Sequence, residues 1–191
     1  MFNIGKFPSV GRIYPVVLLG ACLAGAVISG PVYAAGGGGG GGGGDSNATP
    51  TCPKGEVWSS KAQKCVKQQG SLLPDSDLTN YAFALAEAGR YEEALGVLDT
   101  LKNPNTAVAL NYRGYATRKL GRTDEGIGYY MKSVELDPQY AKVREYLGEA
   151  YVIKGHLDLA KDQLAKIRGI CGTGCEEYRD LAEAIENPSK L

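Results

Sequence analysis

Glycine recurs at a fixed interval in the second half of this chain of 191 residues. Gly114 and Gly148 are 34 residues apart, and the same interval separates Gly121 from Gly155. A period of this length predicts consecutive copies of one supersecondary unit, because such a unit buries its apolar side only by stacking on its neighbours. The second half of the chain is therefore predicted to be a stack of similar units.

The apolar residues of the units follow a helical spacing. Ile127, Tyr130, Met131 and Val134 lie at positions i, i+3, i+4 and i+7, which places them on one face of an amphipathic helix. The three prolines between residues 75 and 191 are at positions 104, 138 and 188, outside such patterns. Each unit is therefore predicted to be a pair of helices.

Small residues occupy equivalent positions in each predicted pair. Two helices approach closely only where a bulky side chain is missing, so these residues are expected to let each pair close. They are Ala82, Gly114 and Gly148 on the first helices, and Ala94, Gly126 and Ala160 on the second. Gly89, Gly121 and Gly155 are expected in the turns between paired helices, where a positive φ favours glycine.

Two segments carry a specific family resemblance. GRYEEAL at residues 89–95 and VELDP at residues 134–138 resemble the tetratricopeptide repeat, and the resemblance covers about residues 75–172. It implies an all-α fold, a right-handed superhelical stack of three helical hairpins with a C-terminal capping helix. A small disulfide hairpin is predicted before the stack from the residues around Cys52 and Cys65. The repeats are assigned to residues 71–172, with units at about 75–104, 107–140 and 141–172.

The middle unit departs from the family pattern. Thr117, Thr123 and Gly126 are polar or small at positions where larger apolar groups are common in the family. Less apolar volume is then available to fill the space between its two helices. This hairpin is therefore expected to be looser than its neighbours.

A solenoid needs a polar cover on its last apolar face. TGCE at residues 173–176 fits an N-terminal capping box, and Leu181, Ala184 and Ile185 then form an apolar stripe at helical spacing. Residues 173–191 are predicted to be a capping helix and a short tail.

The N-terminus has the pattern of a secretory signal peptide. Residues 1–34 contain no acid; they carry Lys6 and Arg12, then an apolar run at residues 16–28, and end in small residues before a predicted cut after Ala34. The apolar run has 13 residues, and a helix needs about 20 to cross a bilayer. A cleaved leader is therefore favoured over a retained membrane anchor.

A second interpretation of the leader is lipidation. LGAC at residues 19–22 resembles the lipobox of bacterial lipoproteins, which implies an acylated Cys22 and an outer-membrane location. The apolar residues that follow Cys22 disfavour it. Residues 35–50 are predicted to be a flexible linker, because residues 36–44 are nine consecutive glycines. This glycine run is either a spacer or a neutral expansion.

Four cysteines remain once the leader and Cys22 are removed. An even number in an oxidising compartment predicts two disulfides, with three possible pairings, of which pairing between nearest neighbours is the simplest. The four are Cys52, Cys65, Cys171 and Cys175. In that pairing the second bridge clips the loop that sets the angle of the capping helix.

Residues 51–70 are predicted to form a small module closed by Cys52 and Cys65, with strands around Val57 and Val66. The pattern resembles fragments of small disulfide modules, including chitin-binding ones. Trp58 either stacks on a sugar ring or a partner, or covers the disulfide and packs on the helices. If Trp58 stacks on a sugar ring, the module is expected to bind the cell wall or a saccharide.

The resemblance also implies a partner site. Members of the family bind ligands in a concave groove lined by the first helix of each pair, and a groove with aromatic and charged side chains suits an extended peptide or a helix. By register, the groove residues are Thr79, Phe83, Val108, Asn111, Tyr115, Arg118, Lys142, Glu145, Glu149 and Val152. A protein or peptide partner is therefore predicted, with membrane contact only if Cys22 is lipidated.

Charge and motifs argue against several other functions. The chain has 21 basic and 21 acidic residues, which gives no basic footprint for nucleic acid. The spacing of Cys171 and Cys175 is not a redox motif, and the single histidine, His156, is predicted in an exposed turn. No catalytic residue, metal ligand or cofactor is predicted. We expect an exported scaffold or adaptor that is not an enzyme, most simply periplasmic, with secretion as an alternative.

Overall fold

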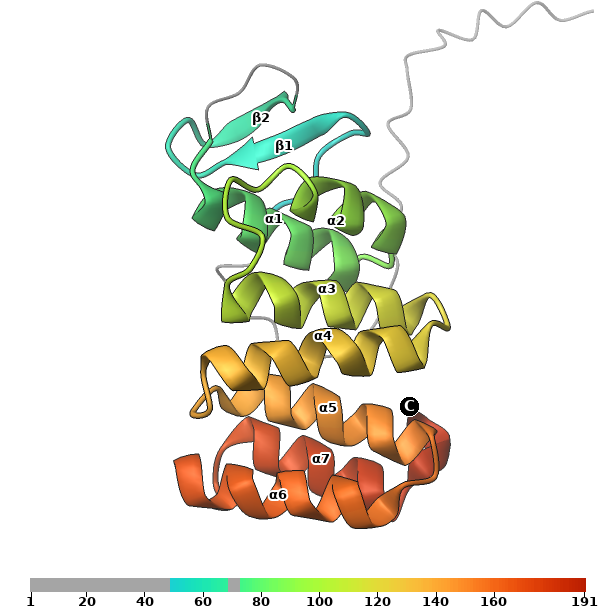
Figure 1. Cartoon of the computed structure of the whole chain (residues 1–191). Coiled ribbons are helices and arrows are strands. Elements are labelled where there is room, and N and C mark those ends of the chain that lie inside the picture. Colours follow the sequence, from blue (N-terminus) through green and yellow to red (C-terminus); the bar gives the residue numbers. More distant parts are fainter. Residues whose placement is uncertain (1–48, 69–72) are drawn as a thin grey trace, which may run out of the picture. The chain divides into compact units, whose positions relative to one another are not determined.

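The computed structural model describes residues 49–68 and 73–191. Within these ranges a two-stranded hairpin precedes seven α-helices (Figure 1). The elements are β1 Glu56–Ser59, β2 Lys64–Lys67, α1 Asp75–Glu87, α2 Tyr91–Leu98, α3 Ala107–Lys119, α4 Thr123–Leu136, α5 Ala141–Ile153, α6 Leu157–Cys171, α7 Glu176–Glu186 and the 3₁₀ turn η1 Pro188–Lys190. None of the described helices has the length and apolar character needed to cross a bilayer. The predicted leader at residues 1–34, with Cys22, and the glycine run at residues 36–44 lie outside the described residues.

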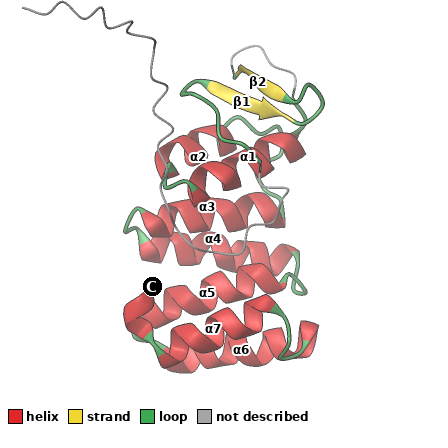
Figure 2. Ribbon diagram, turned by 180° about the vertical axis from the view of Figure 1, so that it is seen from behind, coloured by secondary structure: helices red, strands yellow, loops and turns green. Residues whose placement is uncertain are grey.

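Neighbouring helices pack as antiparallel hairpins, α1 with α2, α3 with α4, and α5 with α6. The first helices also contact one another in order, α1 with α3 and α3 with α5, and α7 packs on both α5 and α6 (Figure 2). The predicted fold class is confirmed: a helical repeat with a C-terminal capping helix follows a small disulfide hairpin.

The turns within the helical hairpins have the predicted backbone. Gly89, Gly121 and Gly155 have φ angles of 75°, 82° and 78°. At each turn the residue after the glycine donates its backbone N–H to a carbonyl five residues earlier, as Arg90 does to Leu85 over 2.8 Å. A residue with a Cβ would be strained at this φ, so the glycine period marks the turns.

The middle hairpin is closely packed, so the expectation that it is looser is wrong. A Cβ added to Gly114 would lie 2.6 Å from the Tyr130 ring, and one added to Gly126 would lie 2.9 Å from the Gly114 carbonyl oxygen. Tyr130 and Thr117 are fully buried. The small residues do not leave space, because the backbones of α3 and α4 approach each other to fill it.

Gly148, at the position equivalent to Gly114, contacts a different helix. A Cβ added there would lie 2.5 Å from the Leu181 side chain of α7. The three atoms nearest to this added Cβ all belong to Leu181, so the close approach of α7 requires a glycine here. In this unit the space on α5 is taken by the capping helix α7.

The small hairpin shares its core with the first helices. Val57 is fully buried in one cluster with Leu78 and Tyr81 of α1, and Cys52 belongs to the same cluster. The Cys52 backbone N–H donates to the Tyr81 hydroxyl oxygen over 3.0 Å, and the Arg90 guanidinium donates to the Cys52 carbonyl over 2.7 Å. These contacts fix the hairpin on the first helical pair.

The cysteines pair with their nearest neighbours in the chain. Cys52 bonds to Cys65 across the two strands, in which Val57 faces Val66, and Cys171 bonds to Cys175 between α6 and α7. The predicted strands around Val57 and Val66 are confirmed.

Candidate functional site

The ten residues predicted to line the partner groove, which is the surface formed by α1, α3 and α5, divide into two sets. One set is buried and so is not available to a partner: Thr79, Asn111, Arg118, Glu145 and Val152. The other set reaches the surface in part or in full: Phe83, Val108, Tyr115, Lys142 and Glu149. The division arises because α1, α3 and α5 contact one another and cover the residues between them.

Aromatic rings connect the three first helices along the partner groove. Phe83 of α1 stacks on Tyr112 of α3, with ring centroids 4.4 Å apart. Tyr115 of α3 lies 5.0 Å from Tyr146 of α5 and 6.3 Å from Phe83. Offset and tilted pairs of this kind are favourable. Phe83, Tyr112 and Tyr115 are half-buried, so their rings offer apolar surface to a ligand.

Arg118 lies beneath this aromatic row. Its side chain is only 2% exposed and pairs with the Glu149 carboxylate over 2.6 Å. Its Nε donates to the Tyr130 hydroxyl oxygen over 3.3 Å, and its guanidinium lies over the rings of Tyr115 and Tyr146. Every side of the guanidinium is engaged within the protein. Arg118 therefore joins α3, α4 and α5 and is not free to bind a ligand.

Glu145 places a buried carboxyl group at the α7 side of the partner groove. The residue is 3% exposed, and its Oε2 lies 3.0 Å from the Lys142 ammonium without a hydrogen bond among the described residues. Burial raises the pKa of the Glu145 carboxyl to about 8, although Lys142 opposes the shift and Glu149 and Asp180 add to it. Lys142 also pairs with Glu176 of α7 over 3.3 Å.

Asn111 and Thr79 are occupied by contacts within the protein. Asn111 is fully buried and donates its side-chain amide to the Tyr140 hydroxyl oxygen over 3.1 Å. The Thr79 hydroxyl donates to the Asp75 carbonyl of its own helix over 2.7 Å. Both side chains hold the structure that supports the partner groove.

Four residues of the partner groove were not predicted from the sequence. Tyr112 and Tyr146 complete the aromatic row, while Lys119 and Glu87 are exposed at the ends of α3 and α1. The Lys119 ammonium lies 5.7 Å from the centroid of the Tyr115 ring. Tyr112 and Tyr146 are 34 residues apart, so the repeat period itself was a signal that could have found them.

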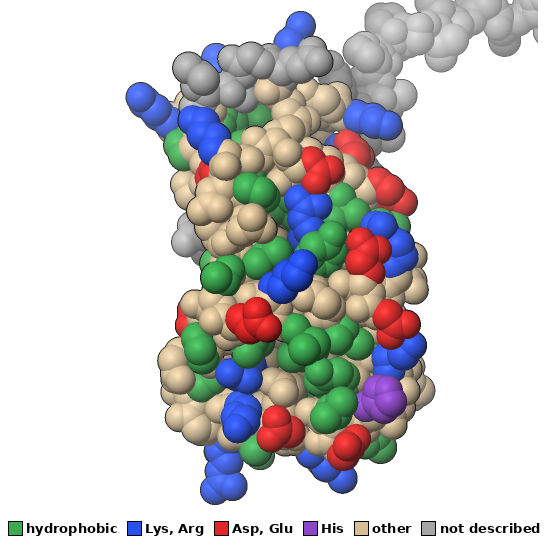
Figure 3. Space-filling model, viewed as in Figure 1, with side chains coloured by type: hydrophobic (Ala, Val, Ile, Leu, Met, Phe, Trp, Pro, Cys, Tyr) green, Lys and Arg blue, Asp and Glu red, His purple; other side chains and the backbone are tan. Residues whose placement is uncertain are grey.

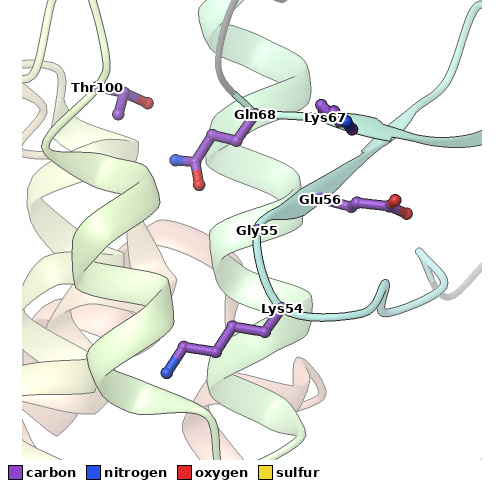
Figure 4. A pocket seen from close by; sticks show the side chains of 6 residues that line it. All are labelled: Lys54, Gly55, Glu56, Lys67, Gln68 and Thr100. Atoms are coloured by element: carbon purple, nitrogen blue, oxygen red, sulfur yellow. The ribbon is translucent and has the colours of Figure 1, made fainter.

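A separate cleft of about 730 Å³ lies beside the small hairpin (Figure 4). Its lining comprises Lys54, Gly55, Glu56, Lys67, Gln68 and Thr100. The side chains of Lys54 and Gln68 extend to the side of Thr100, while Glu56 points the other way. Trp58 does not line the cleft; it is partly buried and packs against the core cluster.

Among the described residues, Cys171, Cys175 and Glu177 form a group of possible metal ligands, with ligand atoms within 4.8 Å of one another. Both sulfur atoms are joined in a disulfide. A disulfide sulfur is not the thiolate that binds metals, so the group fits a structural bridge better than a metal site.

Comparison with known proteins adds evidence on the fold. No protein-family model matches the chain, and no curated protein sequence matches it. Among solved structures, it is similar to the Yersinia enterocolitica type III secretion translocator chaperone SycD in an alternative dimer, with 20% identity over 61% of this chain and 95% of that chain and a TM-score of 0.52. The fold is tetratricopeptide-like. A structure of SycD in complex with a peptide of the translocator YopD has 20% identity over 59% of this chain and 86% of that chain, with a TM-score of 0.48.

Proposed function

We propose that this tetratricopeptide-like protein is an exported adaptor that binds a protein or peptide partner in the partner groove. The observation that carries the proposal is the half-buried aromatic row of Phe83, Tyr112 and Tyr115. Rings on α1 and α3 offer a ligand an apolar track, while neighbouring charges set its direction. The described residues offer no equivalent arrangement for a chemical reaction.

The charges beside the row suit an extended chain. Lys119 and Glu87 are exposed at the end of the row, and Lys142 is partly exposed at the other side of the partner groove. Each can form an ion pair or a hydrogen bond with a peptide without breaking the buried pair of Arg118 and Glu149.

We place the protein in the periplasm. The pattern of a signal peptide at residues 1–34 supports export, and disulfides such as Cys52–Cys65 persist in an oxidising compartment. The mass of the processed chain tests the location. A chain that begins at Ala35 supports a cleaved leader, whereas a chain that begins at an acylated Cys22 would make the protein a lipoprotein of the outer membrane.

Site-specific photo-crosslinking in living cells tests the partner groove. A photoreactive amino acid at Lys119 is expected to give a discrete crosslinked product, because this side chain lies at the exposed end of the aromatic row. Lys132 is the matched control, since it is an equally exposed lysine on α4, where it lies over the Tyr129 ring.

The crosslinked product at position 119 is expected to disappear when Phe83 is changed to Ala in the same chain. Phe83→Ala removes the ring that stacks on Tyr112. Equal products from positions 119 and 132, or a product that survives Phe83→Ala, would contradict the assignment of the partner groove.

A further inference from the structure

The small hairpin is strongly basic in a chain without net charge. Residues 49–68, which we call the basic hairpin, contain Lys54, Lys61, Lys64 and Lys67 but only one acid, Glu56. Four positive charges less one negative charge give a net charge of +3, against zero for the chain of 191 residues. The rest of the chain therefore carries a net charge of −3, so the basic hairpin stands out as an element with an excess of positive charge.

The four lysines are available to an external anion. All four side chains are exposed, and no ion pair joins any of them to a carboxylate within the described ranges. Lys54 lies near enough to Glu93 to lower the pKa of that carboxyl, but Glu93 is held by two hydrogen bonds from Arg90. Figure 3 shows basic side chains projecting at the end of the molecule that carries the basic hairpin.

The backbone of the basic hairpin is held in place, so its lysine side chains project from fixed backbone positions. The Cys52–Cys65 disulfide closes it, and the bonds to Tyr81 and Arg90 fix it on the helices. Lys54 and Lys67 lie at the base of the two strands beside the cleft of Figure 4, and Lys61 and Lys64 lie at the turn. A phosphate group can enter this cleft beside Lys54, because ammonium groups bind phosphate as point charges.

We propose that the basic hairpin docks on an anionic phospholipid surface. Exposed large apolar side chains occur elsewhere among the described residues but not on the basic hairpin, so the contact would be electrostatic and would not insert into the hydrocarbon. The sequence supplies the reason for choosing a membrane over another polyanion. The apolar run at residues 16–28 is the segment with affinity for a bilayer, and the basic hairpin follows it closely.

Few residues separate the predicted leader from the basic hairpin. From the predicted cut site, 48 − 34 = 14 residues lead to the first described residue, and 14 residues span at most about 50 Å when extended. While the leader remains in a bilayer, the local concentration of lipid headgroups around the basic hairpin is therefore high. In the precursor an apolar segment and a basic surface act together, and such a pair holds a protein at a membrane far better than either alone. After cleavage at Ala34 the basic hairpin is the remaining signal, and its binding then depends on charge alone.

Vesicle co-sedimentation tests the proposal with the chain as an exporting bacterium processes it. Vesicles of equal parts phosphatidylglycerol and phosphatidylethanolamine are compared with neutral vesicles of phosphatidylcholine. Binding is expected for the anionic vesicles alone, and to be lost in about 1 M salt, where the screening length falls to about 3 Å. Lys61→Ala/Lys64→Ala is expected to lower the partition coefficient about 25-fold, or roughly fivefold for each lysine.

The matched control is Lys161→Ala/Lys166→Ala, which removes the same charge from two exposed lysines of α6. Its partition coefficient is expected to stay near that of the unmodified chain. An equal loss in both variants would overturn the proposal, because net charge alone would then explain binding. No binding to anionic vesicles, with retention on dextran sulfate, would overturn it in favour of a soluble polyanion as the ligand.

Discussion

The two ends of the helical stack are closed by different devices. At the C-terminal end the amphipathic helix α7 packs on the last repeat, where Leu181 contacts Gly148. At the N-terminal end a disulfide-bonded hairpin inserts Val57 and Cys52 into the core of the first pair. Both devices cover apolar side chains that a further repeat would otherwise cover.

The difference shows what a helical cap and a β-hairpin cap each need in order to be stable. A helix of eleven residues supplies its own backbone hydrogen bonds and needs only an apolar stripe, as α7 has in Leu181 and Ala184. Two strands of four residues each cannot hold together alone in water. The basic hairpin therefore depends on the Cys52–Cys65 bridge and on hydrogen bonds with Tyr81 and Arg90.

Among the substitutions in the two caps, Leu181→Ala is expected to lower the stability of the protein most. Leu181 is fully buried, and loss of a buried leucine side chain costs about 3–4 kcal/mol in the free energy of unfolding. Denaturant unfolding of the variant and the unmodified chain measures the difference.

A double variant tests whether the contact between Gly148 and Leu181 sets the stability of the C-terminal cap. Gly148→Ala alone is expected to destabilise the protein, because its Cβ would lie 2.5 Å from Leu181. In combination with Leu181→Ala the added methyl group enters the vacated space, so Gly148→Ala should then be stabilising. The same sign for Gly148→Ala in both backgrounds would show that α7 does not depend on this contact.

Loss of the Cys52–Cys65 bridge is expected to have the next largest effect. Cys52→Ser/Cys65→Ser opens a loop with a sequence separation of 13, which should cost about 3 kcal/mol. Cys171→Ser/Cys175→Ser opens a separation of 4 and should cost about 2 kcal/mol by the same loop-entropy relation. Thermal unfolding of the two variants compares them. A larger loss of stability from Cys171→Ser/Cys175→Ser would contradict the view that the basic hairpin depends more on its disulfide than the capping helix does.

A pH-dependent effect is expected at the C-terminal cap. The Glu145 carboxyl has a pKa of about 8 in the folded protein because it is buried, against a usual value of 4.5. The folded protein therefore holds this proton more tightly than the unfolded chain, and its stability should fall as the pH rises from about 4.5 to about 8. At about 1.4 kcal/mol for each pKa unit, the full shift sets an upper limit of about 5 kcal/mol on this fall.

Glu145→Gln is expected to remove this contribution, and denaturant unfolding measured at several pH values provides the comparison. The amide keeps the shape of the side chain and cannot ionise. The unmodified chain and the variant should differ in the slope of stability against pH between about 4.5 and 8. Equal slopes would show that Glu145 is already ionised at neutral pH and is compensated by Lys142.

The sequence predicted the stack better than it predicted the groove. The glycine period located the turns, because only a residue without a Cβ adopts the positive φ of Gly89 without strain. Register alone placed Thr79 and Glu145 in the partner groove, yet both are buried. The exposure of a position on a first helix depends on how closely the next first helix approaches, and a single sequence does not contain that distance.

The sequence by itself determined the local features of this protein: its helices, its turns and the positions at which a side chain must be absent. These follow from backbone sterics and from the spacing of apolar residues, which act over a few residues. The tertiary structure decided which helix fills the space left by each glycine, so that Gly114 contacts Tyr130 of its own hairpin while Gly148 contacts Leu181 of α7. It also made the basic hairpin a cap, because Val57 is buried only where Leu78 and Tyr81 of α1 cover it. Contacts between segments distant in the sequence are chosen by packing, which acts on the whole chain at once.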